Sequence, residues 1–237
     1  MATPPGEHTL LSQAIHSDAR SRRMNDTVLI DYGSGNLRSA EKALIRAARD
    51  RGLGVNIIVS SDPGSVAGAG RIVLPGVGAF ADCMNGLTKI PGMREALQTA
   101  VLERGVPFLG ICVGMQLLAS VGREFGDHPG LGWIDGEVMT LSPSDPALKI
   151  PQIGWNELTV TSPHPLFAGI ESGAHAYFVH SFAMRPVNPA HILAKSDYGG
   201  PFAAAIGRDN IAGTQFHPEK SQKIGLHLLG NFLEWRP

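Results

Sequence analysis

The chain has 237 residues, a formal net charge of −1 and 43% hydrophobic residues, which is enough to bury the core of one large domain. It lacks the basic excess of nucleic-acid binders, and no run of about 20 apolar residues is present to span a membrane. The two cysteines, Cys83 and Cys112, form neither a disulfide framework nor a Cys-x-x-Cys pair. We therefore expect a globular protein of the reducing cytoplasm that binds neither nucleic acid nor membrane.

The beginning of the chain differs from the rest. Residues 1–25 are polar and contain proline, without the apolar stretch of about 7 residues that a secretory signal needs. We expect a disordered extension, or an upstream start codon ahead of Met24. A single domain is then predicted over residues 26–237.

From residue 27 onward, short apolar runs alternate with segments of helical spacing. The apolar runs end in glycine, proline or serine, as strands do, and the helical segments stop at a glycine. This alternation predicts an α/β fold, a three-layer sandwich with a mainly parallel central sheet. The expected strands are residues 27–33, 55–61, 71–78 and 106–111, and the expected helices are residues 36–52, 93–105 and 113–122.

The second half of the chain is richer in strand patterns, which predicts a β-rich flank on the same domain. An amphipathic helix over residues 221–235 is expected to close the fold. The expected strands are residues 132–141, 150–160, 176–184, 191–199 and 201–216, the last folded back at a hairpin tip at 208–210.

Cys112 lies where a strand is expected to turn into a helix, in the sequence Gly110-Ile111-Cys112-Val113-Gly114. This G-x-C-x-G spacing is the thiol analogue of a nucleophile elbow, in which the glycines permit a close backbone approach. The positive end of the following helix would stabilise a thiolate. A buried core cysteine and a redox or metal cysteine are the alternatives, but the strand-turn-helix context favours a nucleophile. Cys83 lacks that context and is expected to be structural.

A thiol nucleophile needs a base, and His217 is the best candidate among nine histidines. It follows an expected strand and precedes the last helix, and Pro218 stiffens the turn. Glu219 is two residues further on and could accept a hydrogen bond from the imidazole. The order Cys112, His217, Glu219 thus satisfies the logic of a nucleophile, a base and an orienting acid.

The loop Leu74–Phe80, with the sequence LPGVGAF, is the candidate anion-binding loop. Backbone N–H groups of Gly76, Val77 and Gly78 could face a ligand, and the Val113 amide is the natural second donor of an oxyanion hole. A peptide flanked by two glycines can also rotate easily, because neither neighbour has a β-carbon.

Taken together, the elbow, the late His-Pro-Glu and the Pro-Gly loop resemble the class I, triad-type glutamine amidotransferases. The segments DYGSGNL, LPGVGAF, IGWNEL and YFVHSF further resemble the glutaminase subunits of imidazole glycerol phosphate synthases. The resemblance covers residues 27–237. It implies that Cys112 attacks the amide of glutamine, that His217 transfers protons with Glu219 holding its ring, and that no metal or organic cofactor is needed. It also implies a glutamine-binding set of Gln116, His180, Ser181 and Phe182.

In that family the ammonia passes to a (β/α)8-barrel cyclase subunit of a heterodimer. The cyclase forms imidazole glycerol phosphate and aminoimidazole carboxamide ribonucleotide in L-histidine biosynthesis. The resemblance places Asn36, Trp155 and Lys220 beside this partner, and it implies that an amide near Val77 is turned away until the partner binds its own substrate.

Three other functions remain as alternatives. The chain could be the glutaminase subunit of an anthranilate or aminodeoxychorismate synthase, although the GSGNL and PGVG segments speak against it. A stand-alone cysteine hydrolase would usually lack the late His-Pro-Glu. A non-catalytic binding module would typically have lost Cys112 or His217, and both are present.

Overall fold

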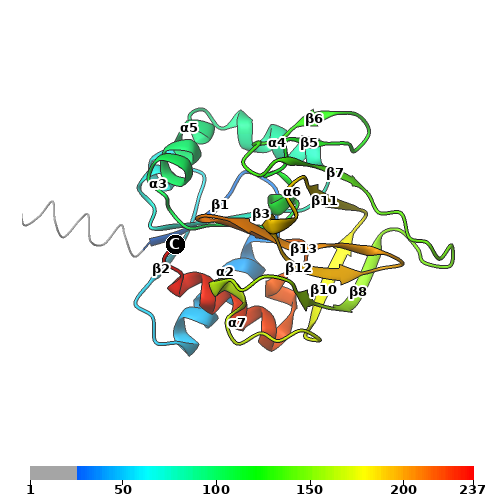
Figure 1. Ribbon diagram of the computed structural model, residues 1–237. Coiled ribbons are helices and arrows are strands. Elements are labelled where there is room, and N and C mark those ends of the chain that lie inside the picture. Colours follow the sequence, from blue (N-terminus) through cyan, green and yellow to red (C-terminus); the bar gives the residue numbers. More distant parts are fainter. Residues whose placement is uncertain (1–25) are drawn as a thin grey trace, which may run out of the picture.

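The computed structural model describes residues 26–237, so the expected extension at 1–25 lies outside the described residues (Figure 1). Its centre is an eight-stranded sheet with the order β2-β1-β3-β4-β14-β13-β12-β9. The first five strands are parallel: β2 (Asn56–Ser60), β1 (Asp26–Ile30), β3 (Arg71–Gly76), β4 (Phe108–Cys112) and β14 (Ile211–Thr214). The antiparallel remainder is β13 (Pro201–Arg208), β12 (Ile192–Asp197) and β9 (Thr159–Val160).

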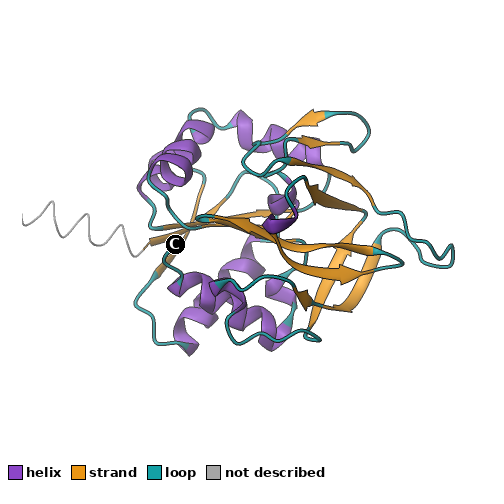
Figure 2. Cartoon of the chain, in the orientation of Figure 1, coloured by secondary structure: helices purple, strands orange, loops and turns teal. Residues whose placement is uncertain are grey.

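Helices cover both faces of this sheet, which confirms the predicted three-layer arrangement (Figures 1 and 2). One face carries α2 (Leu37–Asp50) and α7 (Gln222–Glu234), and the other carries α3 (Pro63–Gly68), α4 (Phe80–Lys89) and α5 (Met93–Leu97), which continues as the π-helical segment η1 (Gln98–Glu103). Helix α2 turns five buried aliphatic side chains inward at helical spacing and packs against α7.

Part of the predicted β-rich flank forms two small additional sheets, whereas the strands expected over 191–199 and 201–216 belong to the central sheet as β12, β13 and β14. One of the additional sheets pairs β10 (His175–His180) with β8 (Gln152–Glu157). The other has the strand order β11 (Phe182–Pro186), β7 (Gly136–Thr140), β5 (Val121–Gly122) and β6 (His128–Pro129).

Three short 3-10 turns join elements in this half of the chain: η2 (Pro165–Phe167), η3 (Pro189–His191) and η4 (Pro218–Lys220). Within residues 26–237, every helix is too short or too polar to cross a bilayer.

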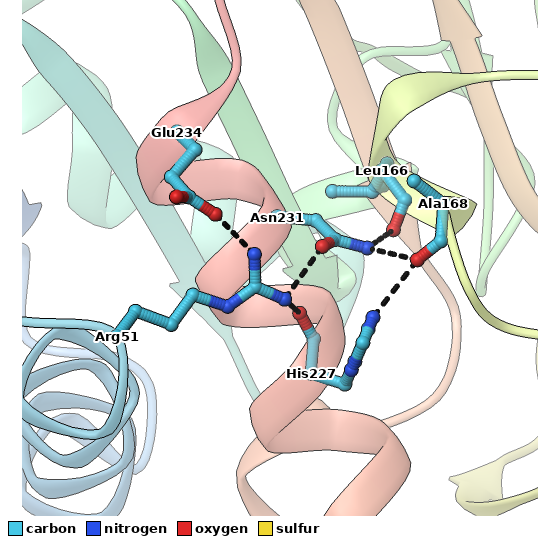
Figure 3. Close-up of polar contacts among 6 residues, drawn as sticks. All are labelled: Arg51, Leu166, Ala168, His227, Asn231 and Glu234. Carbon is cyan, nitrogen blue, oxygen red and sulfur yellow. Dashed lines mark hydrogen bonds and ion pairs between the residues drawn. The ribbon is translucent and has the colours of Figure 1, made fainter.

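The polar side chain of Arg51 ties the end of α2 to α7 (Figure 3). Its guanidinium donates hydrogen bonds to Asn231 Oδ1 at 2.7 Å and to the His227 carbonyl at 3.1 Å, and it pairs with the Glu234 carboxylate. Asn231 in turn donates to two carbonyl groups at the η2 turn. This cluster fixes the helix that directly follows the candidate base.

Most expected elements of the parallel half are confirmed within a few residues, but the expected helix over 113–122 is wrong. Helix α6 (Val113–Gln116) is a single turn. The carbonyl groups of Leu117, Leu118 and Ala119 accept hydrogen bonds from backbone N–H groups of residues 131–134. Because the next loop takes these acceptors, the helix cannot continue.

Further differences concern element number. The expected strand over 150–160 is two strands, β8 and β9, which belong to different sheets. The expected strand over 176–184 is likewise two strands, β10 and β11, in different sheets. The break falls at Ser181, whose carbonyl accepts from the Leu141 N–H at 2.8 Å. Helices α3 and α4 were not predicted, although α4 buries Phe80, Cys83 and Leu87 at helical spacing.

Candidate active site

The candidate residues meet at the carboxyl edge of the parallel strands. Strand register pairs Gly76 at the end of β3 with Cys112 at the end of β4, and Ile111 with Thr214 at the end of β14. His217 follows β14 after two residues and therefore emerges at the same edge. Ligands of open α/β sheets bind outside this edge.

Cys112 occupies the sharp turn that its glycine spacing predicts. Its φ is 54° and its ψ is −113°, a conformation that non-glycine residues rarely adopt. A β-carbon at Gly110 would come within 2.5 Å of the Gly114 carbonyl oxygen, and one at Gly114 would collide with the Leu74 carbonyl. The two glycines are therefore required where strand and helix cross closely.

The side chains of Cys112, His217 and Glu219 lie together and are almost completely buried. Cys112 is 4% exposed and His217 is 2% exposed, and His217 Nδ1 lies 2.8 Å from Glu219 Oε1. Burial alone lowers the pKa of His217, but the interactions with Cys112 and Glu219 outweigh that cost and raise it to about 9. His217 Nε2 makes no hydrogen bond of good geometry within the described residues, so we attribute the influence of Cys112 to its proximity and charge.

A pocket of about 270 Å³ opens above Cys112, just below the usual range of ligand sites, about 300–1,000 Å³. Its size suits a ligand as small as one amino acid. It brings together ten of the predicted site residues: Val77, Gly78, Cys112, Val113, Gln116, His180, Ser181, Phe182, His217 and Lys220.

The remaining predicted residues lie outside the pocket wall. Gly76 is buried below it, where a β-carbon would come within 2.6 Å of the Gly114 nitrogen, and Glu219 lies behind His217. Asn36 is the N-cap residue directly before helix α2. Trp155 is 44% exposed on β8.

Trp155 is nevertheless connected to the pocket through an aromatic contact. Its ring meets the Tyr177 ring edge-on at 5.7 Å. The Lys220 ammonium lies 5.7 Å from the centre of the same tyrosine ring. Since Lys220 also lines the pocket, it connects the Trp155–Tyr177 ring pair to the pocket.

The peptide at Val77 is held by Ser34, a residue that sequence reasoning did not single out. Ser34 Oγ donates to the Val77 carbonyl at 2.6 Å and accepts from the Val77 N–H at 3.3 Å. The Cys83 thiol lies 3.2 Å from Ser34 Oγ and donates to the same carbonyl at 3.4 Å. The Val77 amide therefore faces Ser34. Cys83 is buried as expected, but it contacts this loop.

The wall formed by residues 180–182 contains a neutral histidine. His180 Nδ1 lies 2.8 Å from the Phe182 carbonyl; because a carbonyl only accepts, Nδ1 carries the proton. Burial lowers the pKa of His180 to about 4.

Besides Ser34, sequence reasoning missed two polar residues of the site. Glu124 lines the pocket and accepts a hydrogen bond from the Phe80 N–H at 2.7 Å. Gln215 is buried beside Cys112. Glu124 has no motif around it, whereas Gln215 is two residues before His217 and could have been found from that position. Among residues 26–237, no three metal-ligating side chains come together.

Comparison with known proteins agrees with this architecture. The family model described as "Glutamine amidotransferase class-I" matches residues 28–235. A crystal structure of a glutamine amidotransferase has the same fold with a TM-score of 0.65, at 20% identity, covering 87% of this chain and 97% of that one. Another, from Thermotoga maritima, gives a TM-score of 0.59 at 15% identity, covering 88% and 96%. The chain therefore belongs to the class I glutamine amidotransferase family.

Curated relatives narrow the family further. A protein of Rhodospirillum rubrum is 63% identical, covering 88% of this chain and 98% of the relative. One from Caulobacter vibrioides is 60% identical, covering 90% and 100%, and one from Agrobacterium fabrum is 58% identical, covering 88% and 98%. All three are named imidazole glycerol phosphate synthase subunit HisH, and this chain belongs with that group of the family.

Proposed function

We propose that this chain is the glutaminase subunit of an imidazole glycerol phosphate synthase. It hydrolyses glutamine to glutamate and ammonia in histidine biosynthesis. Membership of the HisH group supports this function. The single observation that carries the chemistry is that Cys112 and His217 line one amino-acid-sized pocket while Glu219 is bonded to the far side of the His217 ring.

The reaction follows from the roles of these three side chains. The Cys112 thiolate attacks the side-chain amide carbon of glutamine, and the imidazolium of His217 gives its proton to the departing nitrogen. Ammonia leaves and a thioester remains. His217 then takes a proton from water, which attacks the thioester and releases glutamate. Glu219 holds the ring and stabilises its charged form.

Substrate recognition uses the opposite wall of the pocket. Glu124 offers a carboxylate to the α-ammonium group of glutamine, because one of its oxygens remains beyond the bond to Phe80. Gln116 and the backbone of residues 180–182 complete the binding surface. The charge of Glu124 and the size of the pocket both favour a free amino acid over a peptide.

The tetrahedral intermediate needs two backbone donors. The Val113 N–H begins the turn after Cys112, and the Val77–Gly78 segment is the second source. The bond between the Val77 N–H and Ser34 supports the idea that this second donor is withheld in the isolated chain.

The ammonia goes to a (β/α)8-barrel cyclase subunit in a heterodimer, in the cytoplasm. The exposed apolar side chains of Trp155 and of Ile153, which is 63% exposed, support a partner on this side of β8. Asn36 and Lys220 are the other proposed contacts. The two free cysteines, Cys83 and Cys112, are compatible with a reducing compartment.

The test is glutamate release from L-glutamine by the full chain mixed with a cyclase subunit and its nucleotide substrate. We expect Cys112→Ala to abolish release without loss of folding or partner binding. Arg46→Ala is the control, because Arg46 forms only an exposed pair on α2. Residual glutaminase activity in Cys112→Ala, or stimulation by an anthranilate synthase partner instead, would contradict the proposal.

A further inference from the structure

A buried amide that is not part of the pocket wall contacts the proposed nucleophile. Gln215 is completely buried, and its Nε2 lies 3.7 Å from Cys112 Sγ. Its backbone N–H donates to the Ala204 carbonyl at 2.9 Å, which extends the pairing of β14 with β13 by one residue. The strand pairing therefore fixes where this side chain starts.

The hydrogen-bond partners also fix which end of the amide faces the sulfur. The Phe182 carbonyl only accepts, so the Gln116 group 2.9 Å away must be the nitrogen. The same nitrogen lies 3.0 Å from Gln215 Oε1, which must therefore be the oxygen. The remaining end of the Gln215 amide, its NH₂ group, points at Cys112. A reversed Gln215 would leave two donors facing each other.

A thiolate at Cys112 needs a donor of this kind. Helix α6 has only one turn, so it supplies little of the dipole stabilisation that a long helix would give. His217 is charged on one side of the sulfur, but it must release its proton during the reaction. A neutral amide on another side never titrates, and it keeps a hydrogen bond to the sulfur throughout.

We propose that Gln215 is a further residue of the glutaminase site, whose side-chain amide holds the Cys112 sulfur in position and stabilises its thiolate. This inference rests on the proposed function, in which Cys112 is the nucleophile. Through its oxygen, Gln215 also occupies a hydrogen of the Gln116 amide. Because Phe182 takes the other hydrogen, Gln116 has only its carbonyl oxygen left to accept a hydrogen bond from glutamine.

The other titratable groups around the sulfur whose pKa is shifted favour their neutral forms near neutral pH. Burial raises the pKa of Tyr32 and of Cys83, which favours their neutral forms, and His180 is neutral above pH 5. A pH profile of Cys112 reactivity above that value therefore reports mainly the pair formed with His217. The titratable groups of this part of the molecule are Tyr32, Cys83, Glu124, His180, His217 and Lys220 around the sulfur and the pocket, and Glu219 behind His217.

The experiment measures how fast iodoacetamide alkylates Cys112 in the full chain between pH 5 and 10, with the modified Cys112 peptide quantified by mass spectrometry. Gln215→Met keeps the side-chain volume and removes the donor. We expect it to raise the apparent pKa of alkylation by about 1–2 units, the effect of one hydrogen bond to a charged group. Gln215→Asn, which is too short to reach the sulfur but remains polar, should give a rise in the same direction.

Thr214→Val is the matched control. Thr214 is equally buried and neighbours Gln215, but its hydroxyl bonds only to the Phe216 carbonyl. Its alkylation profile should equal that of the wild type. With the cyclase subunit present, Gln215→Met should lower kcat/KM for glutamine about 10- to 100-fold, with KM also raised because Gln116 is released.

The outcomes separate this inference from the proposed function. A low wild-type pKa that stays unchanged in folded Gln215→Met and Gln215→Asn would overturn the role of Gln215 alone. A wild-type Cys112 that reacts with an ordinary thiol pKa near 8.5 would instead count against the activated nucleophile itself. If Gln215→Met does not fold, Gln215→Asn decides the question by the same measurement.

Discussion

His217 and Glu219 are joined by a hydrogen bond, yet only His217 transfers protons in the proposed reaction. We expect His217→Ala to lower kcat by several orders of magnitude, because the thiol loses its base and the ammonia its proton donor. Glu219→Gln should cost less, since it removes orientation and charge but not the proton carrier. Steady-state glutamate release with the cyclase present measures both, and a slower Glu219→Gln enzyme would contradict this order.

The same residues show what a sequence can reveal at this scale. Cys112, His217 and Glu219 were predictable because each lies in a short local pattern, the G-x-C-x-G turn or the His-Pro-Glu segment. Glu124 lies in no such pattern, and the DYGSGNL segment that contains Ser34 does not by itself reveal what the Ser34 hydroxyl binds. Their place beside the pocket follows from how distant loops pack, as when the Glu124 carboxylate accepts from the Phe80 N–H.

Helices and strands could be predicted where their own residues contain the whole pattern of apolar spacing and end signals. Helix α2 shows its apolar stripe and its glycine stop in sequence, so its bounds were found. Helix α6 ends early because residues 131–134 bond to the carbonyl groups of residues 117–119, which a longer helix would need, and nothing within residues 113–122 signals that competition. The division of 176–184 into β10 and β11 likewise depends on which sheet pairs with each half.

The link between α2 and α7 is an element-scale feature that can be tested. Arg51→Ala removes two hydrogen bonds to α7, to Asn231 and to the His227 carbonyl. We expect the free energy of unfolding to fall by about 1–3 kcal/mol, with little from the half-exposed Glu234 carboxylate. Urea denaturation measures this, and Arg46→Ala, which breaks only the exposed pair with Asp50, should change stability by less than about 0.5 kcal/mol. Equal losses of stability in the two variants would show that the Arg51 contacts do not stabilise the packing of α2 against α7.

For the whole molecule, His180 and His217 predict how stability depends on pH. Both titrate near pH 6.5 when unfolded. The folded pKa of His180 is about 4, so the unfolded chain binds the extra proton between pH 4 and 6.5 and stability falls as pH drops. The folded pKa of His217 is about 9, so its contribution is complete below pH 6.5 and is lost as pH rises to 9.

These two groups together place their stability maximum near pH 6.5. Urea denaturation at pH 4.5, 6.5 and 9 should show it, each limb contributing up to about 1.4 kcal/mol per pH unit. His180→Gln should flatten the acid limb and leave the alkaline one. If stability fell as steeply with acid in His180→Gln as in the wild type, the acid limb could not be assigned to His180.

The largest consequence concerns the dependence of the site on a partner. In the isolated chain the Val77 N–H is bonded to Ser34, and lacking one oxyanion donor costs on the order of 10²–10³ in rate. We therefore expect the isolated chain to be nearly inactive, and a cyclase subunit with its nucleotide to raise glutaminase activity at least about a hundredfold. Ammonia is then made only when an acceptor is present.

Substitutions of Ser34 and of Trp155 should distinguish two contributions to this dependence, the withheld oxyanion donor and the binding of the partner. Ser34→Ala frees the Val77 peptide, whose neighbours Gly76 and Gly78 allow it to rotate, so the basal rate should rise and the activation ratio should shrink. Trp155→Ala leaves that hydrogen bond intact and removes an exposed ring from β8, so it should weaken complex formation instead. Glutamate release by the chain alone, with the cyclase, and with cyclase plus nucleotide measures both effects. An unchanged basal rate in Ser34→Ala would mean that another contact withholds the donor, and equal wild-type rates in all three mixtures would exclude partner control altogether.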